Sequence, residues 1–211
     1  MIFHIDKILH DIRVCLDENG YSESLIQIKD TDALSLDEII RAKVLPAVDQ
    51  VHLSAPYSRI EQGHNFGDAV YWREMESGWV ILPDDFLRLV VFEMSDWERP
   101  VFTAITPSDA LYAHQRSRIK ALRGTPQRPV CVLSIRQEGR VLEFYSCKDE
   151  SAYVTRAVYI PIATMDEDGG IDISGRCYEA VVYTAASLSL VTLGEVERAN
   201  ALSTMATTLL Q

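Results

Sequence analysis

The sequence contains one long segment that carries almost no charge. Residues 177–193 are seventeen positions with a single charged side chain, Glu179. A helix with so little polar surface must be covered on most of its sides. A membrane span needs about 20 mostly apolar residues, whereas this segment is shorter and includes Tyr, Ser and Thr side chains. We therefore expect a buried helix, covered by the chain's own strands or by identical neighbours.

Helical patterns occupy both ends of the chain. Residues 5–16 place apolar side chains at helical spacing, with charged residues on the other face. Ser35 and Glu38 form an S-x-x-E capping box that starts a second helix. Pro46 lies inside the pattern of this helix and is expected to kink or divide it. The last forty residues predict two more helices, over about 175–193 and 195–210.

In the middle of the chain the apolar pattern changes to the period of a β-strand. A hydroxyl cap, a proline and an acid at residues 106–109 predict a further helix over 107–123. The predicted strands cover about 69–75, 79–82, 86–94, 130–136, 141–147 and 153–160.

The predicted fold class is α+β: mainly a helical bundle from the N- and C-terminal helices, with a β-strand-rich insertion in the middle. We expect a single domain over residues 1–211. Its insertion covers about 57–162 and contains the embedded helix 107–123, and closing helices follow over 163–211.

The charges are unevenly distributed along an acidic chain. The formal net charge is −11, yet residues 101–140 hold seven bases and two acids. If residues 107–123 form a helix, several of these bases share one face with a tyrosine. A solvated helix surface, a protein interface and a site for nucleic-acid phosphates all fit this pattern. The candidate interaction residues are Tyr112, Arg116, Arg118, Lys120, Arg123 and Arg128.

Sequence motifs for catalysis are nearly absent. The chain has no phosphate-binding loop, no dinucleotide fingerprint and no nucleophile elbow. We expect no catalytic residue, no cofactor and no metal, although the pair Asp84-Asp85 is either a turn cap or a metal-binding pair. The four cysteines lack C-x-x-C spacing and are expected to be buried free thiols in a reducing cytosol. The first residues lack a basic n-region, so no signal peptide is expected.

Several segments, in the same order along the chain, resemble a known family. Residues 82–89 (LPDDFLRL) and 94–100 (MSDWERP) resemble the central region of tailed-bacteriophage head–tail connector (adaptor) proteins. Residues 179–186 and 194–199 are similar to the closing helices of these proteins. The middle segments most resemble the connector ring proteins of crAss-like phages. These middle segments are residues 123–131 (RGTPQRPVC) and 142–147 (LEFYSC).

The resemblance implies a virion structural subunit, not an enzyme. It implies a ring of about a dozen copies that docks on the portal protein and on the next tail-side connector protein, at the head–tail junction of a phage or prophage. Packaged DNA passes through such a ring non-specifically, no membrane is involved, and the subunit is made in the bacterial host cytoplasm. An acidic channel wall would repel DNA phosphates.

Two other functions remain open from the residues alone. The first is a phage-encoded nucleic-acid-binding or processing protein that uses the basic patch of residues 116–128. The second is a metal-dependent hydrolase that uses Asp84 and Asp85.

Overall fold

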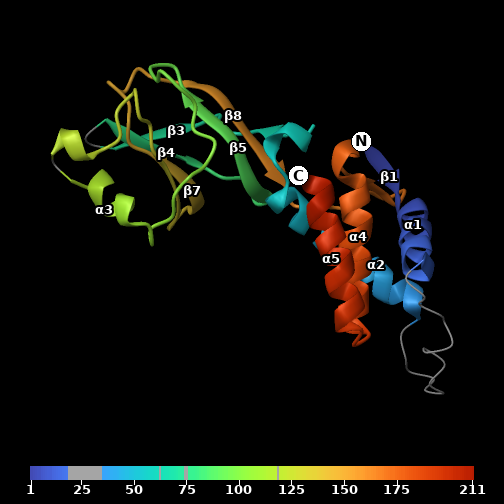
Figure 1. Cartoon of the computed structure of the whole chain (residues 1–211). Coiled ribbons are helices and arrows are strands. Elements are labelled where there is room, and N and C mark those ends of the chain that lie inside the picture. Colours follow the sequence, from blue (N-terminus) through green and yellow to red (C-terminus); the bar gives the residue numbers. More distant parts are fainter. Residues whose placement is uncertain (19–34, 62, 74–75, 118) are drawn as a thin grey trace. The chain divides into compact units, whose positions relative to one another are not determined.

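The computed structural model describes residues 1–18, 35–61, 63–73, 76–117 and 119–211, with the side chain of Lys120 left out. The chain forms two compact units (Figure 1). The first, here called the helical unit, combines Met1–Gln62 with Ile162–Gln211. The second, the β unit, is Gly63–Pro161. Helices and antiparallel sheets are both present, so the α+β class is confirmed.

In its described residues the helical unit contains four α-helices and a short β-ribbon that joins its two chain segments. The ribbon pairs β1 with β9 in antiparallel fashion, and the sequence patterns did not predict it. Helix α4 is the central element, because it packs against α1, α2 and α5. The elements are β1 (Ile2–His4), α1 (Ile5–Glu18), α2 (Leu36–Ser54), η2 (Tyr57–Arg59), β9 (Gly170–Asp172), η4 (Gly175–Cys177), α4 (Tyr178–Thr192) and α5 (Val196–Leu210).

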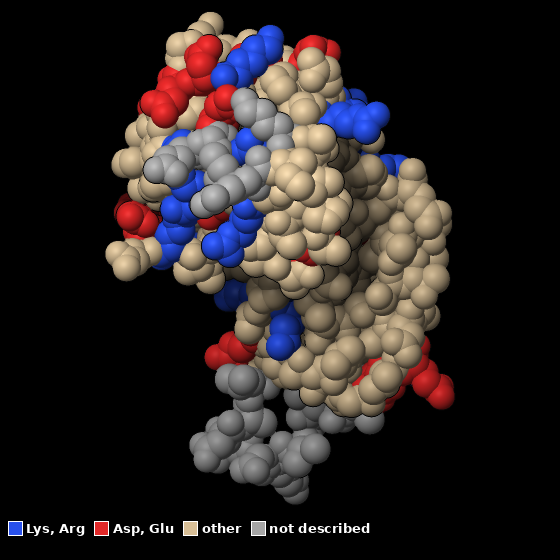
Figure 2. Space-filling model, turned by 90° about the vertical axis from the view of Figure 1, so that its left-hand side faces the viewer, with Lys and Arg blue, Asp and Glu red and all other residues tan. Residues whose placement is uncertain are grey.

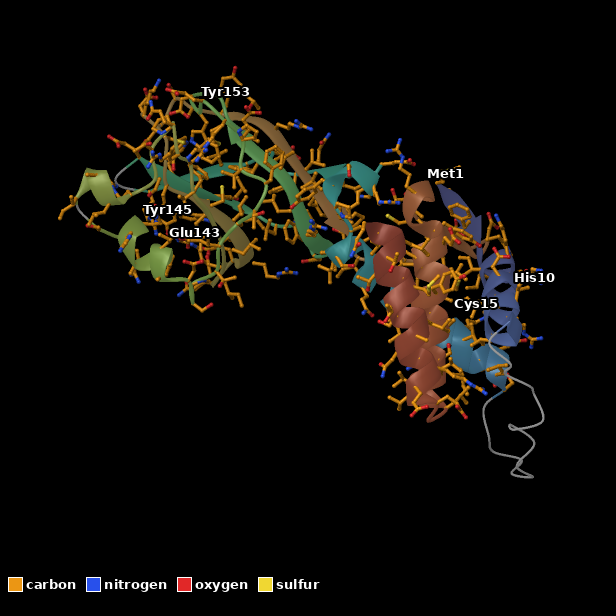
Figure 3. The ribbon with its side chains drawn as sticks, in the orientation of Figure 1. Met1, His10, Cys15, Glu143, Tyr145 and Tyr153 are labelled. Carbon is orange, nitrogen blue, oxygen red and sulfur yellow. The ribbon has the colours of Figure 1, made fainter. Side chains whose placement is uncertain are left out.

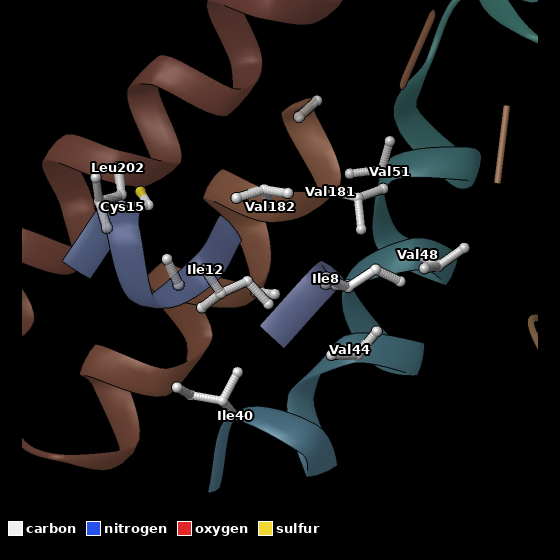
Figure 4. Close-up of a cluster of buried hydrophobic side chains, with 14 of the residues drawn as sticks. Ile8, Ile12, Cys15, Ile40, Val44, Val48, Val51, Val181, Val182 and Leu202 are labelled. Carbon is white, nitrogen blue, oxygen red and sulfur yellow. The ribbon is translucent and has the colours of Figure 1, made fainter. Parts of the chain in front are cut away.

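The apolar faces of these helices meet in one core (Figure 4). Ile8 and Ile12 of α1 lie with Val48 of α2 and Val181 of α4, and all four side chains are fully buried. The prediction that the uncharged segment is a buried helix is therefore confirmed, but helices α1, α2 and α5 cover it, not the expected strands. Its hydroxyl groups are satisfied inside the core, since Ser187 donates a 2.7 Å hydrogen bond to a carbonyl of α5.

The start of α2 follows the predicted capping box. The Ser35 hydroxyl accepts the backbone N–H of Glu38, and the Glu38 carboxylate accepts the backbone N–H of Ser35 at 2.7 Å. Pro46 does not divide the helix, because α2 continues through it to Ser54.

The described residues of the β unit form two antiparallel sheets. One has the strand order β2-β8-β5 and the other β3-β4-β7-β6. Phe92 and Phe144, from different sheets, stack with 6.0 Å between ring centroids, so the sheets share one core. The elements are β2 (His64–Asn65), β3 (Val70–Arg73), β4 (Ser77–Ile81), β5 (Phe86–Met94), α3 (Ala110–Gln115), η3 (Lys120–Leu122), β6 (Cys131–Arg136), β7 (Gly139–Phe144) and β8 (Val154–Pro161).

The embedded helix predicted over 107–123 is wrong in both start and length. It consists of the six-residue α3 and, after a break, the single turn η3. Asp109, not Thr106, caps α3 by accepting the backbone N–H of Leu111 at 2.8 Å. The helix stops because local side chains take over the backbone groups: the Ser117 hydroxyl accepts the N–H of Ile119 at 3.1 Å.

Candidate functional site

The basic residues of the candidate site lie on the connection between β5 and β6. This connection is held by its own hydrogen bonds and by contacts to the sheet. The buried Gln115 side chain donates to the Leu111 carbonyl at 3.1 Å and accepts the N–H of Gly124 at 2.7 Å. A Cβ at Gly124 would lie 2.3 Å from the Ser146 hydroxyl, so a larger residue would have to displace this hydroxyl, which accepts the N–H of Val130 at 3.1 Å. These bonds fix the described part of the connection against the sheet.

The structure brings only some of the predicted residues together. The Arg116 guanidinium lies 5.9 Å from the centre of the Tyr112 ring, within the range of a cation–π contact. Arg123 is partly buried and lines a pocket of about 290 Å³ with Tyr145 and Cys147. Arg128 is exposed on a turn, in which its backbone N–H donates to the Thr125 carbonyl at 2.8 Å.

The prediction that the bases share one helical face is wrong, because α3 is too short to contain them. Arg116 caps the end of α3, Lys120 begins η3, and Arg123 comes after η3, so the three residues do not share one helix. Arg118 lies outside the described residues, and the Lys120 side chain is not described either. The candidate site is therefore irregular and not a charged helix face; residues 111–128 are here called the basic segment.

The two units carry very different charges. The helical unit's residues hold 18 acids and 8 bases, a net charge of −10, whereas the β unit's residues hold 13 acids and 12 bases, a net charge of −1. Figure 2 views the side of the molecule that carries α3 and shows Lys and Arg side chains close together on the β unit, with acidic side chains beside them. The β unit is therefore the less acidic part of the chain, and the basic segment lies within it.

A second polar cluster lies on the four-stranded sheet. Glu143 of β7 is buried, and its carboxylate accepts hydrogen bonds from Ser134 at 2.9 Å and from Arg136 at 3.0 and 2.8 Å. The Tyr145 hydroxyl also donates to this carboxylate, and Figure 3 shows the two side chains next to each other. Arg73 of β3 lies 3.9 Å from the same carboxylate. The cluster thus joins β3, β6 and β7.

The cluster stabilises the charged form of Glu143. Burial alone would raise the pKa of this carboxyl, but the hydrogen bonds from Tyr145, Ser134 and Arg136 outweigh burial, and the pKa is lowered. Burial, and then the bond to Glu143, raise the pKa of Tyr145 well above its ordinary value. The donors therefore surround a carboxylate that is ionised at neutral pH, which is the arrangement of a structural ion pair with Arg136 supported by two hydroxyl groups.

The sequence contained a signal for this cluster that the motif search missed. Ser134 and Arg136 are two positions apart on one predicted strand, and Glu143 and Tyr145 are two positions apart on the next. Such spacing places side chains on one face of a sheet. The observed register pairs Val132 with Glu143 and so brings the two polar pairs together.

Asp85, of the pair considered as a metal site, has an ordinary hydrogen-bond partner, and so does Asp166 in the acidic turn of residues 165–170. Asp85 accepts a 2.8 Å hydrogen bond from the Tyr159 hydroxyl, and burial together with this bond raises the pKa of Tyr159 to about 12. Asp166 accepts the backbone N–H of Asp168 at 3.0 Å within its own turn. Among the described residues no three His, Cys, Asp or Glu side chains gather in a metal-binding group.

The predicted burial of the four cysteine thiols is confirmed. Cys15, Cys131, Cys147 and Cys177 are all buried and free. In the described part of the chain, none of the helices is both long and apolar enough to cross a membrane.

Comparisons with known proteins add no family to this description. A scan against models of protein families gives no match, and a search of curated proteins finds no similar sequence.

Proposed function

We propose that the chain is a structural, non-enzymatic subunit of a head-to-tail connector ring of a tailed phage or prophage. The observation that carries the proposal is the division of charge: a helical unit of net charge −10 and a β unit of net charge −1 that contains the basic segment. A subunit that carries a basic segment on one unit and an excess of acidic residues on the other can bind its own copies head to tail. Such heterologous contacts close into a ring when the rotation between copies allows.

In this proposal the helical bundle is the main body of the subunit, and the β unit is an insertion in it. The basic segment of one copy contacts the acidic helical unit of the next copy. Exposed apolar side chains on the segment support an interface between proteins: Leu111, Ile119 and Leu122 are 49%, 60% and 47% exposed. A surface that binds only nucleic-acid phosphates has no need of them.

The partners of the ring follow from the same proposal. One face docks on the portal protein and the other on the next tail-side connector protein, while packaged DNA passes through non-specifically. Acidic side chains on the channel wall keep DNA from adhering. Neutralising those acids slows DNA ejection and leaves ring assembly intact.

The experiment compares the wild-type chain with Arg116→Glu/Arg128→Glu, because both arginines are exposed. Light scattering measures the mass of each protein alone and mixed with the portal protein. We expect a ring-sized species for the wild type and none for the double variant, with both proteins folded by circular dichroism. Arg156→Glu is the matched control, since it reverses an exposed arginine of the β unit outside the basic segment.

Two outcomes contradict this proposal. A normal ring from the double variant removes the role of the basic segment. A wild-type chain that ignores the portal protein but binds DNA with steep salt dependence supports the nucleic-acid-binding alternative instead.

A further inference from the structure

The four-stranded sheet of the β unit ends at β6, and only half of this edge strand is covered. The segment before α3 pairs with the first half of β6. The Ile105 N–H donates to the Cys131 carbonyl at 2.9 Å, and the Leu133 N–H donates to the Ile105 carbonyl at 2.8 Å. The chain then turns away, because the Thr106 carbonyl accepts the N–H of Asp109 at 3.0 Å.

The second half of β6 presents free backbone groups at this edge. Arg136 and Gly139 pair across a two-residue turn, and the ladder with β7 alternates from there. The contacts with Ile105 show that Cys131 and Leu133 point their backbone groups away from β7, so Ile135 does the same. Within the described residues, the Leu133 carbonyl and both backbone groups of Ile135 have no hydrogen-bond partner.

The side chain at the open edge is apolar. Ile135 is 84% exposed, more than any other large hydrophobic side chain in the described part of the chain. It borders a pocket of about 460 Å³ that Leu82, Tyr112 and Leu133 also line. Natural edge strands are usually protected by lysine, proline or a bulge, because an open edge pairs with other strands. This edge has a β-branched residue that favours such pairing.

The opposite edge of the same sheet offers a matching strand. β3 (Val70–Arg73) is that edge, and in the described residues its outer side has no backbone partner. Four antiparallel strands make β3 and β6 run in opposite directions. Copies repeated in one orientation therefore place β3 of one copy antiparallel to β6 of another, and the sheet continues across the junction. A pairing of β6 with β6 needs a twofold axis and leaves both β3 edges open.

Charges at the two edges favour the same pairing. The exposed Asp68 lies just before β3. The exposed Arg140 lies opposite Ile135 on β7, whereas the guanidinium of Arg136, at the end of β6, is already bonded to Glu143. In an antiparallel junction the start of β3 lies beside the end of β6, which brings Asp68 of one copy close to Arg140 of the other. Opposite charges across a strand pair stabilise it.

We propose that the open half of β6 is a self-association site, and that its occupant is strand β3 of a second copy of this chain. The contact joins identical chains head to tail through a continuous sheet. It does not depend on the connector proposal, because the site is defined by the two sheet edges and not by the basic segment.

The first experiment measures the solution mass by light scattering from micromolar to millimolar protein. We expect the wild-type mass to rise with concentration. Ile135→Pro removes the outward N–H and leaves the ladder with β7 intact, and Ile135→Lys adds an edge charge. Both variants should remain monomeric with unchanged circular dichroism. Tyr153→Lys is the control, because it changes a side chain that is 65% exposed elsewhere in the β unit.

The second experiment identifies the strand that occupies the site. Copies with Ile135→Cys are mixed with copies that carry Asp68→Cys or Val70→Cys, and disulfide-linked dimers are measured after mild oxidation. The native thiols are buried. We expect linked dimers only in the mixtures. Linkage of Ile135→Cys to itself, with none in the mixtures, overturns β3 as the occupant.

A wild-type chain that stays monomeric at millimolar concentration overturns the site altogether. The two proposals can be tested independently, because the double variant Arg116→Glu/Arg128→Glu, which tests the connector proposal, leaves both sheet edges intact.

Discussion

The Arg136 guanidinium donates two hydrogen bonds to Oε1 of Glu143, from Nε at 3.0 Å and from Nη2 at 2.8 Å. The guanidinium also lies 4.1 Å from the centre of the Trp79 ring. Arg136 therefore neutralises a buried carboxylate on β7 and covers the Trp79 ring on β4 of the same sheet. This pair holds β6 to the rest of the sheet, beyond the backbone ladder.

Removing the negative charge leaves Arg136 without its partner. We expect Glu143→Gln to lower the free energy of unfolding by about 2 kcal/mol, because an uncompensated charge then remains in a mostly buried site. Urea unfolding followed by tryptophan fluorescence measures it, since all three tryptophans belong to the β unit. Glu138→Gln, at the exposed β6–β7 turn, is the matched control and should change stability by less than about 0.5 kcal/mol.

The same carboxylate makes the β unit sensitive to acid. The pKa of Glu143 is lowered in the folded chain from an ordinary value of 4.5. The unfolded chain therefore takes up the proton first, so this contribution to stability is fully present above pH 4.5 and is lost as the pH falls through the folded-state pKa. Tryptophan fluorescence during acid titration should show this loss. A Glu143→Gln variant with an unchanged pH slope would contradict the assignment.

The helical unit has its own pH dependence at a higher pH. Burial, partly offset by Asp49 and Asp172, lowers the pKa of His52 from an ordinary value of 6.5. The fold prefers the neutral imidazole, so its stability is full above pH 6.5 and declines as the pH falls toward the folded-state pKa. Ellipticity at the helical minimum should report the decline, which His52→Gln removes. His10→Gln, on the exposed side of α1, should leave it in place.

Local signals in the sequence predicted much of the helical unit. The capping box of Ser35 and Glu38 spans only four residues of sequence, and α2 begins where it indicates. The buried helix over 178–192 follows from the lack of charge, which no exposed helix tolerates. By contrast, the ribbon that pairs Ile2 with Asp172 depends on residues far apart in the chain, and periodicity contains no information on such pairing.

The candidate site was harder to predict because side chains compete with the backbone there. The periodic pattern continues to Arg123, but the Gln115 and Ser117 side chains bond backbone groups that a longer helix would use. The exposed Ile135 is not visible as an open edge from the sequence, because strand order decides which strand lacks a neighbour.

The proline inside α2 provides a test of stability without any change to the core. Pro46 is exposed, lacks the N–H that would bond the Ala42 carbonyl, and crowds the preceding turn. We expect Pro46→Ala to restore that bond and raise the free energy of unfolding by about 1–3 kcal/mol. Thermal unfolding followed by far-ultraviolet circular dichroism measures the gain. Gln50→Ala, an exposed position one turn later, should change stability by less than about 0.5 kcal/mol. A loss of stability in Pro46→Ala would mean that the helix needs the proline's geometry to reach its partners α1 and α4.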